Sequence, residues 1–340
     1  MQNKALETAE SISDIAFGFM GSKALFAALH VDLFSVLSEA VLSAEAVAAR
    51  TDLDVDRATT LLTALTALGL VRHENDGYSN SPAAEAFLVK GRKYDFGDYL
   101  RLQIDRQMYP FMTQLNEALT DDLQEGQIAS YAQWFADPDE ARLYSRSQHA
   151  GSLGPGRSLA KMVDLSAARR LLDIGGGTGA FSISLCSAYP GLSSTIVDFP
   201  TVADVGREFI EAEGMADRIA YQSGNALTDP WPATADAVLM SYLFSGVPGE
   251  AIPVLVRRAY DTLTPGGHFM VHDFMVDDNR EGPKLAALWQ LQHTAFNPHA
   301  KSITSDYVAG LMEGAGFTGI EVSVMIPGMT MLVVGRKPAS

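Results

Sequence analysis

Apolar side chains recur at helical spacing through the first part of the chain. Within residues 21–37 these positions include Leu25, Phe26, Leu29, Leu33, Phe34 and Leu37. This period predicts an amphipathic helix, and residues 55–68 predict another after Asp54, a residue type that caps helices. Two short segments, 70–72 and 77–80, flank a tight turn and predict a hairpin. Helix, turn, helix and hairpin together form a winged-helix pattern.

The pattern changes twice further along the chain. Residues 91–165 are predicted to be mainly helical and are rich in aromatic side chains. From residue 166 onward, short apolar strands alternate with helical segments, which is typical of a doubly wound α/β sheet. We therefore expect a helical winged-helix-like domain over residues 1–90, a helical linker over 91–165 and a Rossmann-like α/β domain over 166–340.

The most specific chemical signal is a glycine-rich turn after the apolar strand at residues 171–174. The run is Asp173-Ile174-Gly175-Gly176-Gly177-Thr178-Gly179, and a helix follows it. Glycines let the backbone N–H groups of such a turn approach a ligand closely. About twenty residues later a second strand ends in Asp198, where a carboxylate can accept hydrogen bonds from two ribose hydroxyls. These features predict a nucleoside-binding βαβ unit.

The acid two residues before the first glycine distinguishes this run from a dinucleotide fingerprint, because a carboxylate is a poor neighbour for a pyrophosphate. The run resembles the motif of S-adenosylmethionine (SAM) methyltransferases instead. Later segments resemble, in order, those of the caffeate, hydroxyindole and polyketide O-methyltransferase family: Asp198-Phe199-Pro200, then residues 224–227, 263–267, 314–317 and 331–336. This resemblance covers nearly the whole chain. It implies SAM as methyl donor and an N-terminal domain that forms a homodimer.

The resemblance also implies which residues bind SAM. In the family, the segment that matches residues 224–227 lines the adenine. The expected SAM-binding residues are Asp173, Gly175, Gly177, Asp198, Phe199, Asn225, Ala226 and Ser241.

The histidine base of the resembled enzymes is missing from this chain. In the family it lies in an H-D-W motif, and Ser245 stands at its position here. Asp273 matches the acid that would orient the base, whereas Ser302 replaces the second such acid. A phenol has a pKa of about 10, and a general base is worth roughly 10²–10⁴ in rate. Because a serine hydroxyl cannot serve as that base, we predict an enzyme with no general base.

An acceptor that reacts without losing a proton fits this absence. A thioether sulfur has an available lone pair, so that catalysis reduces to alignment and exclusion of water. The chain resembles bacterial members of the family that S-methylate 4-methylthio-2-hydroxybutyrate in dimethylsulfoniopropionate synthesis. This acceptor is an anion, so we expect a clamp of cationic or donating groups, and aromatic faces for the sulfonium charge. The candidate substrate residues are Tyr131, Trp134, Arg142, Tyr144, Arg146, Gln148, His149, Tyr242 and His293.

Two alternatives stay open. Aromatic secondary metabolites and oxo acids can be methylated on oxygen, nitrogen or carbon by relatives of this family. The oxo-acid enzymes hold a metal with two histidines, one of them at the position of Ser245, so we expect no metal here. A SAM-binding regulator without catalysis would also keep the glycine turn and lose the base.

Composition restricts the partners. The chain has 340 residues with 25 Lys and Arg against 41 Asp and Glu, a formal net charge of −16. Such a field repels phosphate, and Arg57 is the only cation in the segment that matches a recognition helix. We expect no nucleic-acid or membrane partner. The single cysteine rules out an internal disulfide, and no uninterrupted apolar run approaches ~20 residues, so we expect a cytoplasmic protein.

Overall fold

The computed structural model describes residues 5–124, 126–232 and 234–339. Contacts within the chain define two compact units, of which one ends at Gln107 and the other begins at Met108. This boundary lies inside the helical linker that we expected over residues 91–165. Each unit has its own hydrophobic core.

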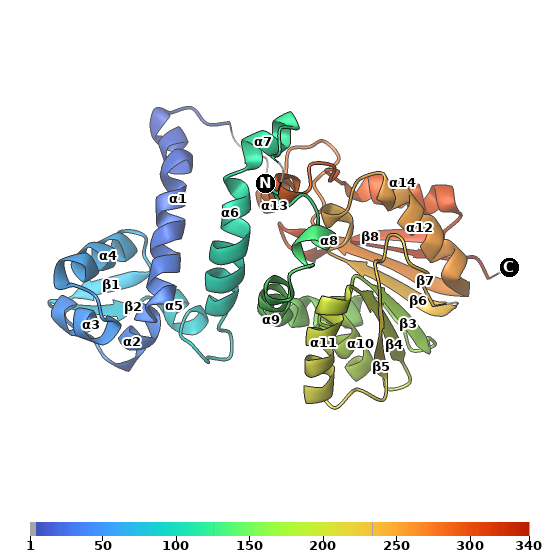
Figure 1. Cartoon of the computed structure of the whole chain (residues 1–340), viewed down its shortest axis with the longest axis horizontal. Coiled ribbons are helices and arrows are strands. Elements are labelled where there is room, and N and C mark those ends of the chain that lie inside the picture. The colour runs from blue at the N-terminus through green and yellow to red at the C-terminus, as the bar shows by residue number, and fades with distance from the viewer. Residues whose placement is uncertain (1–4, 125, 233, 340) are drawn as a thin grey trace. The chain divides into compact units, whose positions relative to one another are not determined.

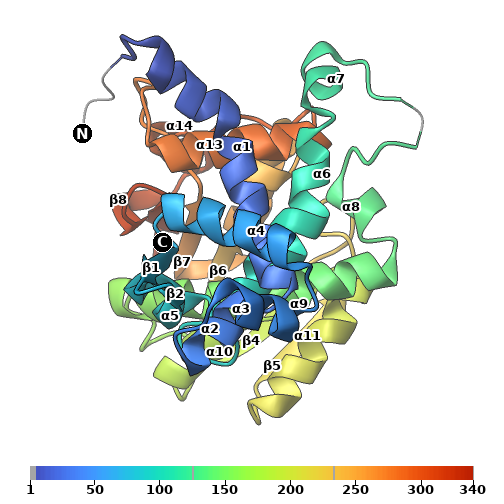
Figure 2. The ribbon, with the colours of Figure 1, turned by 90° about the vertical axis from the view of Figure 1, so that its left-hand side faces the viewer.

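The N-terminal unit packs short helices around a two-stranded antiparallel hairpin (Figure 2). Its elements are α1 (Ala9–His30), α2 (Leu33–Glu39), α3 (Ala44–Thr51), α4 (Val55–Ala67), β1 (Val71–Glu74), β2 (Gly77–Asn80), α5 (Pro82–Phe87) and the π-helix η1 (Tyr99–Met108). The Asp54 side chain caps α4 as expected, accepting hydrogen bonds from two backbone N–H groups. The single helix expected over residues 21–37 is wrong, because Asp32 adopts a left-handed conformation (φ 51°) and separates α1 from α2.

Helix α1 leaves much of its apolar surface exposed. Large side chains at Ile12, Ile15, Phe17, Phe19 and Met20 are all more than half exposed. By length and mean hydropathy alone, α1 is long and apolar enough to cross a membrane, and 17% of its apolar window is buried. The sequence criterion of an uninterrupted apolar run did not identify this helix. Core helices and signal sequences meet the same criteria of length and hydropathy, so these do not by themselves indicate a membrane span. An apolar face of this kind is typical of an interaction surface.

The C-terminal unit contains a seven-stranded sheet with the order β5-β4-β3-β6-β7-β9-β8 (Figure 1). The strands are β3 (Arg170–Ile174), β4 (Ser193–Asp198), β5 (Ile219–Ser223), β6 (Ala235–Ser241), β7 (Leu263–Asp273), β8 (Thr318–Ile326) and β9 (Thr330–Arg336). The strands β3 to β7 are parallel to one another, whereas β9 is antiparallel to both β7 and β8. The predicted doubly wound α/β fold is confirmed.

Helices cover both faces of this sheet (Figure 1). The helices of this unit are α6 (Tyr109–Met112), α7 (Leu115–Thr120), α8 (Tyr131–Trp134), α9 (Pro138–Met162), α10 (Ala180–Ala188), α11 (Pro200–Ala212), α12 (Ala251–Thr262), α13 (Lys284–Phe296) and α14 (Ser305–Ala315). Of these, α9, α10 and α11 cover one face of the sheet, and α12 and α14 cover the other. Alternate residues of β3 enter opposite cores: Leu171 packs with α9, α10 and α11, and Leu172 packs with α12 and α14. The chain passes from β3 to β4 on one side of β3, whereas β6 lies on the other side of β3. The sheet therefore has a switch point between β3 and β6, and folds of this kind bind ligands at such a point.

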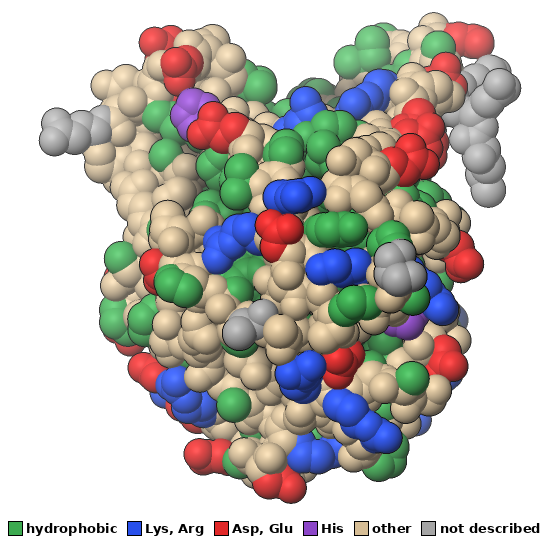
Figure 3. All heavy atoms as spheres, turned by 90° about the vertical axis from the view of Figure 1, so that its right-hand side faces the viewer, with side chains coloured by type: hydrophobic (Ala, Val, Ile, Leu, Met, Phe, Trp, Pro, Cys, Tyr) green, Lys and Arg blue, Asp and Glu red, His purple; other side chains and the backbone are tan. Residues whose placement is uncertain are grey.

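Charges of both signs are mixed on the surface of this unit. On the face shown in Figure 3, Lys and Arg side chains alternate with Asp and Glu among the residues that the figure colours. Such a face does not present the single-signed basic track that phosphate backbones require.

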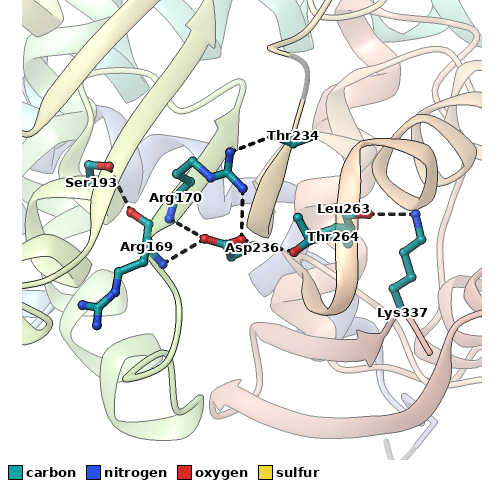
Figure 4. Close-up of polar contacts among 8 residues, drawn as sticks. All are labelled: Arg169, Arg170, Ser193, Thr234, Asp236, Leu263, Thr264 and Lys337. Atoms are coloured by element: carbon teal, nitrogen blue, oxygen red, sulfur yellow. Dashed lines mark hydrogen bonds and ion pairs between the residues drawn. The ribbon is translucent and has the colours of Figure 1, made fainter. Parts of the chain in front are cut away.

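Asp236 joins three strands at the end of the sheet opposite the switch point (Figure 4). Its carboxylate accepts hydrogen bonds from the backbone N–H groups of Arg169 and Arg170, each at 3.0 Å, and from the Thr264 hydroxyl at 3.1 Å. The Arg170 guanidinium adds an ion pair at 3.4 Å. Burial by itself would raise the pKa of Asp236, but these donors outweigh it and hold the pKa below its usual value.

We predict that Asp236→Asn lowers the free energy of unfolding at pH 7 by about 1–3 kcal/mol, because several donors then lose a charged acceptor. The folded-state pKa is depressed, so this contribution is present above the ordinary value of 3.8 and is lost as the pH falls below it. Urea unfolding of both proteins at pH 7 measures the difference. Asp261→Asn, which removes an exposed partner of Arg257, is the control and should change stability little. Equal effects of the two substitutions would contradict the role given to Asp236.

Candidate active site

A cavity of about 240 Å³ lies at the carboxyl ends of the central parallel strands. Its wall is formed by the loops that follow β3, β4, β5 and β6, together with residues from α8 and α9. The switch point of the sheet therefore opens into this cavity.

The glycine turn after β3 forms one side of the cavity. Gly175, Gly177 and Gly179 have φ values of 67°, 57° and 77°, in a backbone region that residues other than glycine rarely adopt. A Cβ atom on Gly176 would lie 2.6 Å from the Asp173 carboxyl carbon. Glycines are thus required here by both backbone conformation and space, as the sequence pattern predicted.

Two carboxylates lie against this turn: Asp173, which is fully buried, and Asp198, which is partly buried. Asp173 accepts a hydrogen bond from the Ser182 hydroxyl at 2.6 Å, and its other oxygen has no partner among the described residues. Burial raises the pKa of Asp173 to about 7. Asp198 accepts hydrogen bonds from the N–H groups of Gly177 (2.8 Å) and Phe199 (2.7 Å), and burial raises its pKa to about 6 despite them. The unpartnered buried oxygen of Asp173 beside the cavity fits a ligand that carries a cationic group, as SAM does.

The structure brings all of the expected SAM-binding residues to the cavity wall. They are Asp173, Gly175, Gly177, Asp198, Phe199, Asn225, Ala226 and Ser241. Their individual contacts with SAM stay predictions.

Four of the expected substrate residues also line the cavity: Tyr131, Tyr144, Gln148 and Tyr242. The hydroxyls of Tyr131 and Tyr144 lie 3.3 Å apart, and the Gln148 amide donates to the Tyr144 hydroxyl at 3.3 Å. Trp134 is buried behind this pair, with its ring 5.2 Å from that of Tyr144 and its N–H donating to Glu140. It supports the wall and does not form it.

The expected cationic clamp is not in the cavity. Arg142 and Arg146 are about half exposed and bind Glu208 of α11 at 2.6 and 2.7 Å. His149 stacks on Phe209, 3.7 Å between ring centres, and forms a 2.7 Å hydrogen bond with Thr178.

The rotation of α9 about its axis explains why Arg142, Arg146 and His149 do not line the cavity. Residues Tyr144, Ser145, Gln148 and Ser152 of α9 face the cavity, so the side chains of residues 142, 146 and 149 meet α11 and the glycine turn. His293 is buried beside the Trp289 carbonyl, at 2.8 Å from Nδ1, and is likewise absent from the wall. Among the described wall residues there is no Lys, Arg or His.

The position of the missing base is closed off from the cavity. The Ser245 hydroxyl donates to Asp273 at 2.5 Å, and the Ser245 N–H donates to the other carboxylate oxygen at 3.0 Å. Ser245 is 1% exposed and is not a wall residue. Burial raises the pKa of Asp273 to about 6. Ser302, at the second acid position, donates to the Gln290 side chain at 2.5 Å and therefore has a structural partner.

Sequence reasoning missed three further features of the site. Ser241 forms a 2.9 Å hydrogen bond with His272, which is fully buried, and burial lowers the pKa of that imidazole to about 3. Asn297 lines the cavity and donates to the Gly246 carbonyl at 2.9 Å. Ser145 and Ser152 line it from α9. Alternation along β7 fixes the face of the strand on which His272 lies, but its pairing with Ser241 comes from the register between β6 and β7.

No cluster of three or more His, Cys, Asp or Glu side chains suited to a metal ion occurs in the part of the chain that the structure describes.

Comparison with known proteins supports a SAM-dependent methyltransferase. Residues 115–318 match a family model described as an O-methyltransferase domain, and residues 13–90 match an O-methyltransferase dimerisation domain. The chain is 31% identical over 329 residues to the tetracenomycin polyketide synthesis 8-O-methyl transferase TcmO of Streptomyces glaucescens, with 96% of each chain covered. It is 31% identical over 318 residues to the N,N-dimethyltransferase OxyT of Streptomyces rimosus, with 91% of this chain and 90% of OxyT covered. The crystal structure of human N-acetylserotonin methyltransferase in complex with SAM matches with a TM-score of 0.84 at 25% identity, covering 99% of this chain and 100% of that one.

We predict that Asp198→Ala weakens the binding of S-adenosylhomocysteine by at least about tenfold, because a charged acceptor for ribose hydroxyls is lost. Isothermal titration calorimetry measures this affinity. Asp204→Ala, which removes an exposed carboxylate of α11 outside the cavity, is the control and should bind normally. Unchanged affinity of Asp198→Ala would remove Asp198 from the binding site.

We also predict that affinity for S-adenosylhomocysteine falls by roughly tenfold per pH unit below about 7, as Asp173 becomes protonated and can no longer pair with the ligand ammonium. The ligand-free protein should respond in the opposite direction. Since the folded-state pKa of Asp173 lies above its ordinary value of 3.8, its contribution to stability is greatest at low pH and is lost as the pH rises through about 7. Because burial raises the pKa of Asp198 and that of Asp273 to about 6, Asp173→Asn should remove the part of both trends that lies between about pH 6 and 7, and an unchanged pH dependence there would refute the assignment.

Proposed function

We propose that this chain, which belongs to the O-methyltransferase family, methylates an acceptor whose lone pair is available without a protein base. The chain is a SAM-dependent methyltransferase, and its N-terminal dimerisation domain supports a homodimer. A regulator without catalysis is therefore not proposed. The observation that carries the proposal is the Ser245–Asp273 pair, which fills the family's base position and does not reach the cavity.

The residues of the cavity suit catalysis by alignment. When bound, SAM supplies a methyl group on a positively charged sulfur, which a correctly placed lone pair attacks. Asp173 and Asp198 would hold the amino-acid and ribose ends of SAM, and this fixed placement is worth up to about 7–11 kcal/mol. Tyr131, Phe135 and Tyr144 line the acceptor side, where their rings exclude water and attract cationic charge.

Tyr144 does not replace the missing base. Burial raises the pKa of Tyr144, and its hydroxyl is engaged by Tyr131 and Gln148. A tyrosine with a raised pKa stays protonated at neutral pH, so it can donate a hydrogen bond but cannot remove a proton.

An aromatic acceptor of the secondary-metabolite type fits this cavity best. Its wall is largely apolar and aromatic, and the named activities of the relatives above include both oxygen and nitrogen methylation. An aromatic hydroxyl acidified by conjugation with a carbonyl group, or an amine, presents a reactive lone pair at neutral pH. Either one would react in this site without a base.

A thioether is the second candidate, which the absent base favours because sulfur has no proton to lose. The anionic acceptor 4-methylthio-2-hydroxybutyrate, as in dimethylsulfoniopropionate synthesis, fits less well. Its carboxylate would enter a cavity whose described wall residues include no Lys, Arg or His, and an unpaired buried charge is costly. If sulfur is the acceptor atom, we propose an uncharged thioether.

We predict that Ser245→Ala keeps kcat within about threefold of the wild type, because Ser245 takes no proton from the acceptor. Plots of kcat against pH should show no rising limb with a histidine-like midpoint between about pH 6 and 7. Affinity for S-adenosylhomocysteine serves as the folding control. A loss of 10² or more in kcat with intact affinity would show that the Ser245–Asp273 pair takes part in the reaction.

A panel of acceptors then identifies the nucleophile. It would contain naphthols of graded hydroxyl pKa, an aromatic amine, a neutral thioether and 4-methylthio-2-hydroxybutyrate. Under our proposal, the rate among naphthols rises as the hydroxyl pKa falls. Equal rates for all naphthols would mean that the protein itself removes the proton.

A further inference from the structure

Arg258 of α12 donates hydrogen bonds to three backbone carbonyls of the loop that follows β5. Its Nη1 donates to the carbonyls of Ala226 (2.7 Å) and Leu227 (3.1 Å), and its Nη2 donates to the carbonyl of Asp229 (2.5 Å). Arg258 itself is not a wall residue of the cavity, whereas Ala226 and Leu227 are. The guanidinium therefore holds the loop from the side away from the ligand.

Trp231 completes this support. Its ring centre lies 4.1 Å from the guanidinium carbon of Arg258, and its indole N–H donates to the Ala226 carbonyl at 2.9 Å. The Ala226 carbonyl thus accepts hydrogen bonds from both side chains. A planar guanidinium can stack on an indole face and form several directed hydrogen bonds at once, which a lysine ammonium cannot do.

Hydrogen bonds within the loop connect this support to the cavity. The Asn225 N–H donates to the Asp229 carboxylate at 2.8 Å, and the Leu227 N–H donates to the Asn225 side chain at 2.9 Å. No helix or strand orients the peptide planes of residues 224–229. Because their carbonyls are directed at Arg258, the side chains of Ala226 and Leu227 are presented to the cavity in one arrangement.

We propose that Arg258 is a positioning residue for the adenosine end of SAM. It acts through the carbonyls of Ala226, Leu227 and Asp229, and it sets the shape of the wall that the family resemblance assigns to adenine. The inference depends on the use of SAM and is independent of the identity of the methyl acceptor.

The neighbouring Arg257 provides a matched control. It lies on the same helix, is largely exposed, and interacts with Asp261 (3.5 Å) and the ring of Tyr260 (5.4 Å) and with none of the loop carbonyls. Arg257→Gln and Arg258→Gln remove the same charge from adjacent positions, so any difference between them reports the loop contacts.

We expect Arg258→Gln to weaken S-adenosylhomocysteine binding, measured by calorimetry, by about 10- to 100-fold, because several charge-assisted hydrogen bonds to the loop are lost. The KM for SAM should rise by a similar factor, with kcat and the acceptor KM within about twofold. Arg257→Gln should match the wild type in all four quantities. Unchanged affinity in Arg258→Gln, or equal losses in both variants, would overturn the proposal.

Two further measurements separate positioning from a general loss of structure. Affinity for 5′-methylthioadenosine, which has no amino-acid portion, should fall by the same factor as affinity for S-adenosylhomocysteine. Arg258→Lys, which keeps the charge but loses the fork, and Trp231→Phe, which keeps the ring face but loses the N–H, should each give intermediate losses. If a variant loses affinity for S-adenosylhomocysteine but not for 5′-methylthioadenosine, the effect lies at the amino-acid end, which would contradict the proposal. Arg258→Lys and Trp231→Phe provide this test even if Arg258→Gln fails to fold.

Discussion

A buried carboxylate beneath a glycine turn is the constraint on which the rest of the site depends. Asp173 lies one residue before the end of β3, an inner strand of the sheet, where it is fully buried and keeps one oxygen without a partner among the described residues. Such a group is costly unless a ligand supplies positive charge. The space above it exists because Gly176 has no side chain. The acid and the turn therefore require each other, and together they favour a nucleoside with a cationic end.

The fold brings the remaining residues to this point by two different means. Parallel strands end at one edge of the sheet, so the loops after β3, β4, β5 and β6 meet around the cavity regardless of their distance in sequence. The loop after β5 has no helix or strand, and its peptide planes are oriented by a backbone turn at Asn225 and by side chains behind it. Helix α9 closes another side, where its outward face is fixed to α11 through Glu208 and Phe209. Residues outside the cavity thus determine its shape.

The alternation of strands and helices, the glycine turn and Asp198 could be predicted because each depends on local spacing in the sequence. The direction of the α9 side chains could not, because one residue of shift rotates a helical side chain from the cavity to α11. For this reason Tyr144 and Gln148 were placed correctly on the wall, and Arg142 and Arg146 were not. The break at Asp32 was missed because the apolar period continues across it, and only a left-handed backbone conformation divides α1 from α2. Pairs that form across strands, such as Ser241 with His272, depend on strand register that the sequence does not state.

The two ends of the cavity obey different physical rules. At the SAM end, charged and backbone groups are fixed in position, and one oxygen of Asp173 has no partner among the described residues, so the ligand must match them closely. At the acceptor end, the wall consists of aromatic rings with a few hydroxyl and amide groups, and the position of the base is sealed by Ser245 against Asp273. Apolar walls discriminate by shape more than by chemistry, and a missing methylene there is worth only about 1–3 kcal/mol. A change of acceptor atom therefore needs no change of fold, which agrees with the oxygen and nitrogen activities named for relatives of equal similarity. Under the proposed function, the reactivity of the acceptor has to come from the acceptor itself.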